Sequence, residues 1–131
     1  MEKEFVPYEL ALKLKELGFN EPCLTCYDKL EMIASHGKHV FDYKNYNTSG
    51  YMVSRPTFSQ AFRWFREKHN CSHSINKTYG GQYVPYVNGE ELDLDSELNE
   101  IEGYKWLYTS YEEAELACLT KLIEIVELKS V

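Results

Sequence analysis

The sequence lacks any hydrophobic run near the ~18 residues that a membrane-spanning helix requires. Its first ten residues, MEKEFVPYEL, have neither the basic start nor the apolar stretch of a signal peptide. Its four cysteines in 131 residues are few for a disulfide scaffold, so free thiols are expected. We therefore predict a cytoplasmic protein that does not enter the membrane.

Motifs of known reactions and cofactors are also missing. The chain contains no Walker loop, no dinucleotide-binding fingerprint, no His-Glu-x-x-His and no Gly-x-Ser-x-Gly elbow. We predict no catalytic residue, no metal and no cofactor, and we expect a non-enzymatic protein. An enzyme of unrecognised type is kept as an alternative.

The composition is that of a folded protein. Hydrophobic residues make up 44% of the chain and aromatic residues 15%, enough for a core without disulfides or metal. A chain of 131 residues has the commonest size of a single domain. We predict one domain over residues 1–131.

The negative charge of the chain is concentrated in one segment. The net charge is −7, and residues 90–102 hold seven acids and no base, whereas the remainder carries as many acids as bases. This sign argues against nonspecific DNA or RNA binding, which requires Lys and Arg to neutralise phosphates. The seven acids are Glu90, Glu91, Asp93, Asp95, Glu97, Glu100 and Glu102.

Three interpretations of this acidic segment are open. The simplest is a solvated loop, and a weak divalent-cation site is another. An EF-hand is excluded, because Leu98 replaces the turn glycine and Tyr104 replaces the bidentate Glu. The third interpretation is a recognition surface for a basic partner, which would speed association. Its predicted partner-binding residues are Glu90, Glu91, Asp93, Asp95 and Glu97.

The first half of the chain predicts a helix followed by strands. Leucines recur at helical spacing from Pro7 to Leu17, and Gly18 can end the helix. Residues 23–27 and 39–43 are strand-like. The Asn/Ser/Gly-rich stretch 45–50 predicts a loop.

The second half opens with the clearest helix, after Pro56. Thr57 and Gln60 have the spacing of a capping box, and Asn70 is expected to end the helix. A hairpin is predicted over residues 72–87 around Gly80-Gly81. Within it, Pro85 predicts an edge or bent strand.

A last strand and a long helix complete the predicted fold. Residues 104–108 are strand-like, and Ser110 with Glu113 gives a second capping box for a helix reaching Leu128. The wide apolar face of this helix predicts packing on more than one side. The resulting order α-β-β-α-β-β-β-α predicts an α+β fold, with a mainly antiparallel sheet of about four to five strands packed by three helices.

Three stretches of the chain resemble a known family. They are FVPYELALKLKELGFNEPC (5–23), PTFSQAFRWFREKHN (56–70) and YEEAELACLTKLIEIV (111–126). They are similar to small uncharacterised proteins of phages and prophages of Bacteroides-type gut bacteria. The resemblance implies a phage gene expressed in a bacterial cytoplasm, and no activity or site residue comes with it.

All three arginines fall within 12 residues, which suggests an anion site. On the predicted helix, Ser59, Arg63 and Arg66 lie within about 60° of one another. Free N–H groups at a helix N-terminus favour anions, and Arg55 and Thr57 stand there. These five residues are the predicted contacts of a nucleotide-type ligand, with a partly exposed Trp64 beside them. An ordinary wet helix face with Arg–Glu pairs is the alternative.

Cysteine and histidine groupings give weaker signals. Cys23-x-x-Cys26 is half of a zinc site, but a strand would point its two thiols to opposite faces. Cys71-x-His73 is not the usual second half, so buried free thiols are expected. His36, His39 and Asp42 recur every three residues without a helix to align them.

Tyrosine is abundant in the middle of the chain, where it suits a protein interface or half-buried sheet positions. The tyrosines concerned are Tyr43, Tyr46, Tyr51, Tyr79, Tyr83 and Tyr86. Our first hypothesis is a phage or prophage accessory protein that binds a host or phage protein through the acidic segment and the tyrosine-rich strands. The second is a protein that binds or sequesters a nucleotide-type small molecule. The oligomeric state is left open.

Overall fold

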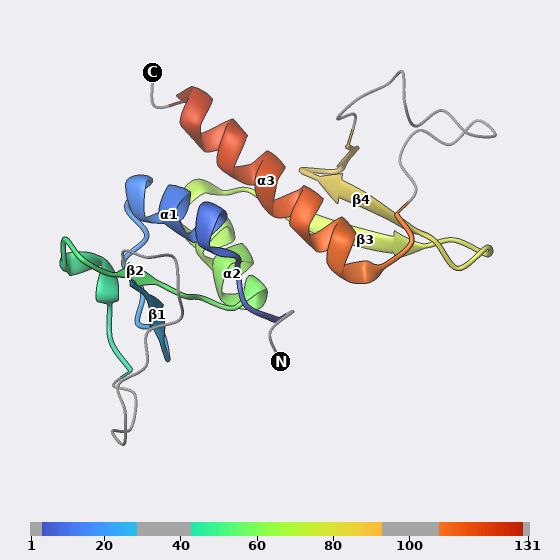
Figure 1. Cartoon of the computed structure of the whole chain (residues 1–131). Coiled ribbons are helices and arrows are strands. Elements are labelled where there is room, and N and C mark those ends of the chain that lie inside the picture. Colours follow the sequence, from blue (N-terminus) through green and yellow to red (C-terminus); the bar gives the residue numbers. More distant parts are fainter. Residues whose placement is uncertain (1–3, 29–42, 93–107, 130–131) are drawn as a thin grey trace. The chain divides into compact units, whose positions relative to one another are not determined.

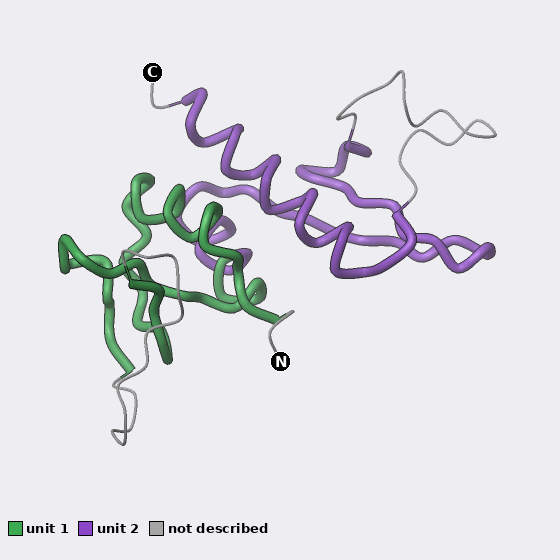
Figure 2. The backbone as a smooth tube through the Cα atoms, viewed as in Figure 1, with its two compact units in different colours: residues 1–61 green, residues 62–131 purple. Residues whose placement is uncertain are grey.

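The computed structural model describes residues 4–28, 43–92 and 108–129. Its elements follow the order α1, β1, a 3-10 helix, β2, α2, β3, β4, β5, α3, which confirms the α+β class (Figure 1). The five strands lie in two antiparallel sheets, β1-β2 and β3-β4-β5. The chain divides into two compact units, 1–61 and 62–131, with the boundary inside α2 (Figure 2). The prediction of one domain stays a prediction.

Helix α1 (Tyr8–Glu16) forms where the leucine spacing predicts it. Pro7 precedes it in an extended conformation, and Leu17 forms the C-cap. Gly18 then takes a φ of 95°, which lets Phe19 N donate to Leu14 O at 2.9 Å. The helix buries Ala11 and Leu14, and Phe19 is also buried, so this turn closes the core of the first unit.

The strands of the first unit are shorter than predicted. β1 (Cys26–Tyr27) pairs with β2 (Val53–Ser54), and ahead of it Cys23 forms an isolated bridge with Lys44. The strand predicted over 23–27 is therefore partly confirmed. The strand predicted over 39–43 lies outside the described residues except for Tyr43, and β2 was not predicted.

The predicted loop 45–50 contains a 3-10 helix (Tyr46–Thr48). Side chains organise it: Asn47 Oδ1 accepts from Ser54 N at 2.8 Å, and Asn47 Nδ2 donates to Phe19 O at 2.9 Å. Lys15 Nζ donates to the carbonyl oxygens of Ser49 and Met52, each at 2.8 Å. These bonds satisfy backbone groups that no strand or helix pairs.

Helix α2 (Phe58–His69) begins and ends as predicted. Gln60 N donates to Thr57 Oγ1 at 3.1 Å, which is one half of the predicted capping box. The Gln60 side chain contacts the segment before β1: its Nε2 donates to Pro22 O at 2.5 Å, and its Oε1 accepts from Cys23 Sγ at 3.6 Å. Asn70 ends the helix with a φ of 52°, and Cys71 N donates to Phe65 O at 3.1 Å.

β3 (His73–Lys77) and β4 (Tyr83–Val87) form the predicted hairpin. Of the edge or bent strand predicted from Pro85, the edge alternative is wrong. β4 is central, between β3 and β5 (Glu90–Glu91). Thr78 N donates to Gln82 O and Asn88 N to Ser72 O, so even-numbered residues of β3 make the bonds to β4. Pro85 faces Ile75 at a non-hydrogen-bonded position, so its missing N–H costs no bond to β3, and on its other side Pro85 O accepts from Leu92 N at 3.1 Å.

Helix α3 (Tyr111–Lys129) packs on β3 and β4 within the second unit. Glu113 N donates to Ser110 Oγ at 3.2 Å, so the predicted N-terminal cap is present. Its buried residues span an arc of about 240° at 100° per residue, which agrees with packing on more than one side. They are Ala114, Ala117, Cys118, Leu119, Leu122, Ile123 and Val126.

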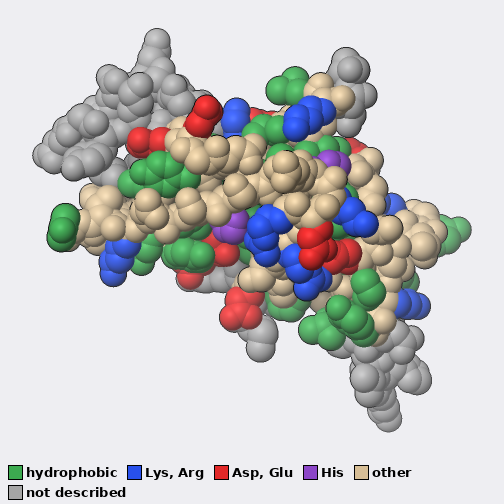
Figure 3. Space-filling view, turned by 180° about the vertical axis from the view of Figure 1, so that it is seen from behind, with side chains coloured by type: hydrophobic (Ala, Val, Ile, Leu, Met, Phe, Trp, Pro, Cys, Tyr) green, Lys and Arg blue, Asp and Glu red, His purple; other side chains and the backbone are tan. Residues whose placement is uncertain are grey.

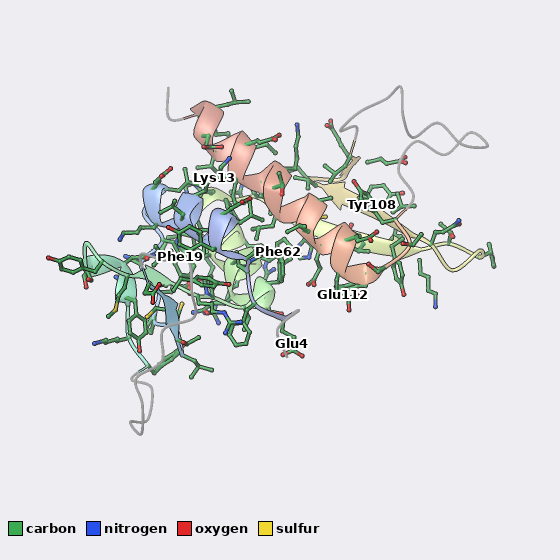
Figure 4. The ribbon with its side chains drawn as sticks, viewed as in Figure 1. Glu4, Lys13, Phe19, Phe62, Tyr108 and Glu112 are labelled. Atoms are coloured by element: carbon green, nitrogen blue, oxygen red, sulfur yellow. The ribbon has the colours of Figure 1, made fainter. Side chains whose placement is uncertain are left out.

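Tyr108 is the one described residue of the strand predicted over 104–108. It forms an antiparallel bridge with Tyr83: Tyr83 N donates to Tyr108 O at 2.8 Å, and Tyr108 N donates to Tyr83 O at 2.9 Å. Figure 4 labels Tyr108 beside the three-stranded sheet. The bridge ties the chain entering α3 to the start of β4.

Candidate functional site

The acidic segment begins on an exposed strand. Glu90 and Glu91 form β5, and both are exposed. Asn88 and Gly89 connect β4 to β5 with φ values of 54° and 82°, and two successive positive values are typical of a type I′ hairpin turn. The turn thus places both carboxylates on the last strand of the described sheet.

The rest of the acidic surface lies outside the described residues, including the predicted contacts Asp93, Asp95 and Glu97. The irregular cation site considered for this segment falls there as well. Among the described strands, β5 pairs only with β4. The observable part of the predicted partner surface is therefore a pair of carboxylates on the outer strand of the described sheet.

The opposite edge of the same sheet has a different chemical character. β3 carries polar side chains, of which Ser74, Asn76 and Lys77 are exposed, while His73 and Ile75 are half-buried. Because its even-numbered residues bond to β4, the N–H and C=O groups of His73, Ile75 and Lys77 point away from the described sheet. This edge was not anticipated from the sequence, although its hairpin was.

The start of β3 lies near an aromatic stack and the cationic side chain of Arg66. The ring of His73 stacks on Phe62, with centroids 3.5 Å apart and planes 14° apart. Burial, together with the charge of Arg66, lowers the pKa of His73 to about 4. His73 is therefore neutral at pH 7, and Arg66 and Lys77 supply the positive charge of this edge.

The five predicted anion contacts differ in their exposure to solvent. Arg55 is buried at 5% exposure, with its guanidinium carbon 4.1 Å from the Phe5 ring centroid and 5.5 Å from that of Tyr27. Thr57 caps α2. Arg55 thus lies over two aromatic rings of the first unit, as in a cation–π contact, and Thr57 stabilises the start of α2.

The other three predicted contacts, Ser59, Arg63 and Arg66, are exposed on α2. The prediction of a partly exposed Trp64 is wrong: it is 3% exposed and contacts Phe65 and His69 edge-on. On the face shown in Figure 3, Lys and Arg side chains are interspersed with acidic ones. A nucleotide-type ligand stays a prediction, reduced to the exposed arginines of α2.

The tyrosines divide by exposure. Tyr79, at the tip of the β3–β4 hairpin, is fully exposed, and Tyr51 in the first unit is 72% exposed. Tyr83 and Tyr86 are half-buried in β4, as sheet positions would be, and Tyr83 meets the ring of Tyr111 edge-on. Tyr79 is thus the most exposed tyrosine among the described residues of the second unit.

The four cysteines are free and buried, as expected. Burial raises the pKa of Cys23 and of Cys118 to about 12, which removes their thiolate character at neutral pH. Within the part of the chain that the structure describes, no three His, Cys, Asp or Glu side chains converge as metal ligands. His36, His39 and Asp42 lie outside that part.

No known protein family, curated protein or solved structure matches this chain. Among the described helices, none combines the length and apolarity needed to span a membrane.

Proposed function

We propose that this chain is a non-enzymatic phage or prophage accessory protein that binds a host or phage protein in the bacterial cytoplasm. The observation that carries the proposal is the exposure of Glu90 and Glu91 on an edge strand at the start of the acidic segment. The exposed Tyr79 on the same sheet adds the residue type that interfaces favour. The phage context rests on the resemblance of residues 5–23, 56–70 and 111–126.

The charge distribution gives the interaction a physical basis. Carboxylates on a strand lose less conformational entropy on binding than carboxylates on a free loop. A smaller part of their electrostatic attraction for a basic partner is therefore cancelled by the entropy cost of binding. Their attraction also raises the rate of encounter, and salt reduces this effect because the Debye length is only about 8 Å at physiological ionic strength.

The test is capture of partners from a host lysate by two variants of equal net charge. In the first, the predicted contacts Glu90, Glu91, Asp93, Asp95 and Glu97 are changed to Gln or Asn. In the second, five exposed acids elsewhere are changed to Gln. These control positions are Glu4, Glu9, Glu16, Glu67 and Glu124.

The proposal predicts that the control variant captures the same proteins as the wild type, and that the first variant loses at least one of them. If both variants captured the same proteins as the wild type, the acidic surface would not be the binding site. Equal loss in both variants would show that only the net charge matters, which also contradicts the proposal.

A further inference from the structure

The β3 edge carries backbone N–H and C=O groups that no other described strand pairs. Its outward N–H and C=O groups belong to His73, Ile75 and Lys77, alternate residues of a five-residue strand. Such a row of backbone groups is a template for an added strand. In Figure 1, β4 runs along one side of β3, and no other labelled strand runs along the other.

The β3 edge carries positive charge, although the net charge of the chain is negative. Lys77 is exposed on the strand, and the exposed Arg66 lies one turn of α2 after Phe62, on whose ring His73 stacks. Glu90 and Glu91 lie on the other edge of the sheet, two strand spacings or about 10 Å away. That separation exceeds the Debye length of about 8 Å, so a ligand at β3 senses a basic edge despite the net charge of −7.

A second copy of the chain fits this edge poorly. Antiparallel pairing of two β3 strands about Ile75 would place Lys77 of each copy opposite His73 of the other. Each Lys77 would then approach the Arg66 that lies near that histidine. Like charges opposed across strands destabilise the pairing, which leaves an acidic strand as the complementary occupant.

We propose that β3 binds an extended acidic peptide segment by strand addition, the segment carrying carboxylates two residues to either side of an apolar residue. Side chains of His73, Ile75 and Lys77 share one face, so the peptide residues opposite them share it too. The apolar residue of the peptide lies opposite Ile75. One carboxylate lies opposite Lys77, and the other lies opposite His73, near Arg66. The segment adds antiparallel to β3, so the residue opposite Ile75 exchanges both backbone hydrogen bonds with it.

This inference rests on the proposed function, because it describes a second contact of the same partner-binding sheet. The probe is the end-blocked, fluorescein-labelled peptide Thr-Glu-Thr-Val-Thr-Glu-Thr, titrated with the full chain by fluorescence anisotropy. Its comparison is the peptide with Lys in place of both Glu residues. We expect the glutamate peptide to bind about tenfold more tightly at low salt, and the difference to shrink as salt is added.

Two substitutions separate charge from backbone pairing. Lys77→Glu should weaken binding of the glutamate peptide about fivefold or more. The control, Lys13→Glu, makes the same charge change at an exposed position of α1 and should leave the affinity unchanged (Lys13 is labelled in Figure 4). Ile75→Pro removes an outward N–H that β4 does not use, opposite a proline the sheet already holds. It should abolish binding while the circular dichroism spectrum stays unchanged.

The peptide offers its own control. Methylation of the central Val nitrogen removes a backbone donor without changing charge, and strand addition predicts that it weakens binding about tenfold. Equal binding of the glutamate and lysine peptides, equal binding to Lys77→Glu and Lys13→Glu, or indifference to the N-methyl group would each overturn the inference.

The failure of this inference is distinct from the failure of the proposed function. Host proteins whose capture requires the acidic segment but survives both Lys77→Glu and Ile75→Pro would overturn the β3 site and support the proposed function. Conversely, binding of the glutamate peptide as predicted supports the β3 site even if neutralising the acidic segment changes no captured protein.

Discussion

Lys15 offers a sharp test of how the first unit is held together. Its ammonium donates to Ser49 O and Met52 O, each at 2.8 Å, and so fastens the loop after the 3-10 helix to α1. A hydrogen bond from a charged group contributes about 1.5–3 kcal/mol when buried. Lys15 is half-buried, so solvent screening reduces the two bonds to about 2 kcal/mol together.

The perturbation is Lys15→Met, which keeps an unbranched side chain of similar helix propensity and removes the donors. We expect the free energy of unfolding to fall by about 2 kcal/mol, or about 0.5 M in the guanidinium chloride midpoint. The matched control is Lys13→Met, an exposed lysine of the same helix, which loses the same charge near the same C-terminus. Its stability should change by less than about 0.5 kcal/mol.

Hydrogen exchange gives the local readout. The Ser54 amide of β2 donates to Asn47 Oδ1 of the 3-10 helix at 2.8 Å. Its hydrogen exchange should be faster in Lys15→Met and should keep the wild-type rate in Lys13→Met. Equal midpoints for the two variants, or unaltered exchange at Ser54, would refute the idea that Lys15 fastens the loop.

Three further predictions concern single groups. Tyr27→Phe removes a buried bond of 2.7 Å from the Tyr27 hydroxyl to Val6 O, so chemical denaturation should show a loss of about 1 kcal/mol or more, and no loss would contradict the bond. The pKa of His73 is lowered to about 4 from an unfolded value near 6.5, so its contribution to the free energy of unfolding is full above pH 6.5 and decreases down to pH 4. An NMR titration that placed the pKa of its ring near 6.5 would contradict this. Cys118, buried with a pKa raised to about 12, should react with a thiol reagent only on unfolding, and rapid labelling of the native protein would contradict its burial.

The helices could be predicted because their signals are local. Thr57 and Ser110 are caps that act within three residues, and Gly18 ends α1 through its own φ. Strands depend on partners distant in the sequence, which explains why β2 was missed: Val53–Ser54 is two residues long and carries no alternation. The Asn88-Gly89 turn, in contrast, is a short-range signal that could have located β5.

The candidate sites show the same division. The acidic segment is visible in composition alone, whereas the burial of Arg55 depends on Phe5, about fifty residues earlier in the chain. Helical periodicity places Trp64 at the margin of the apolar stripe, so its burial likewise depends on tertiary packing that the periodicity does not reveal. Which backbone groups of β3 point outward follows from the register with β4, and a hairpin prediction without a register does not supply it.

The most direct test of the central claim is the rate at which a captured partner associates with the purified chain. It should be measured by stopped flow at several salt concentrations, with Glu90→Lys, Glu91→Lys as the variant and Glu9→Lys, Glu16→Lys as the control of equal charge. Binding through the acidic edge predicts that only the first variant associates more slowly, by about tenfold at low salt, with rates converging as salt rises. Equal rates for the two variants at every salt concentration would contradict it.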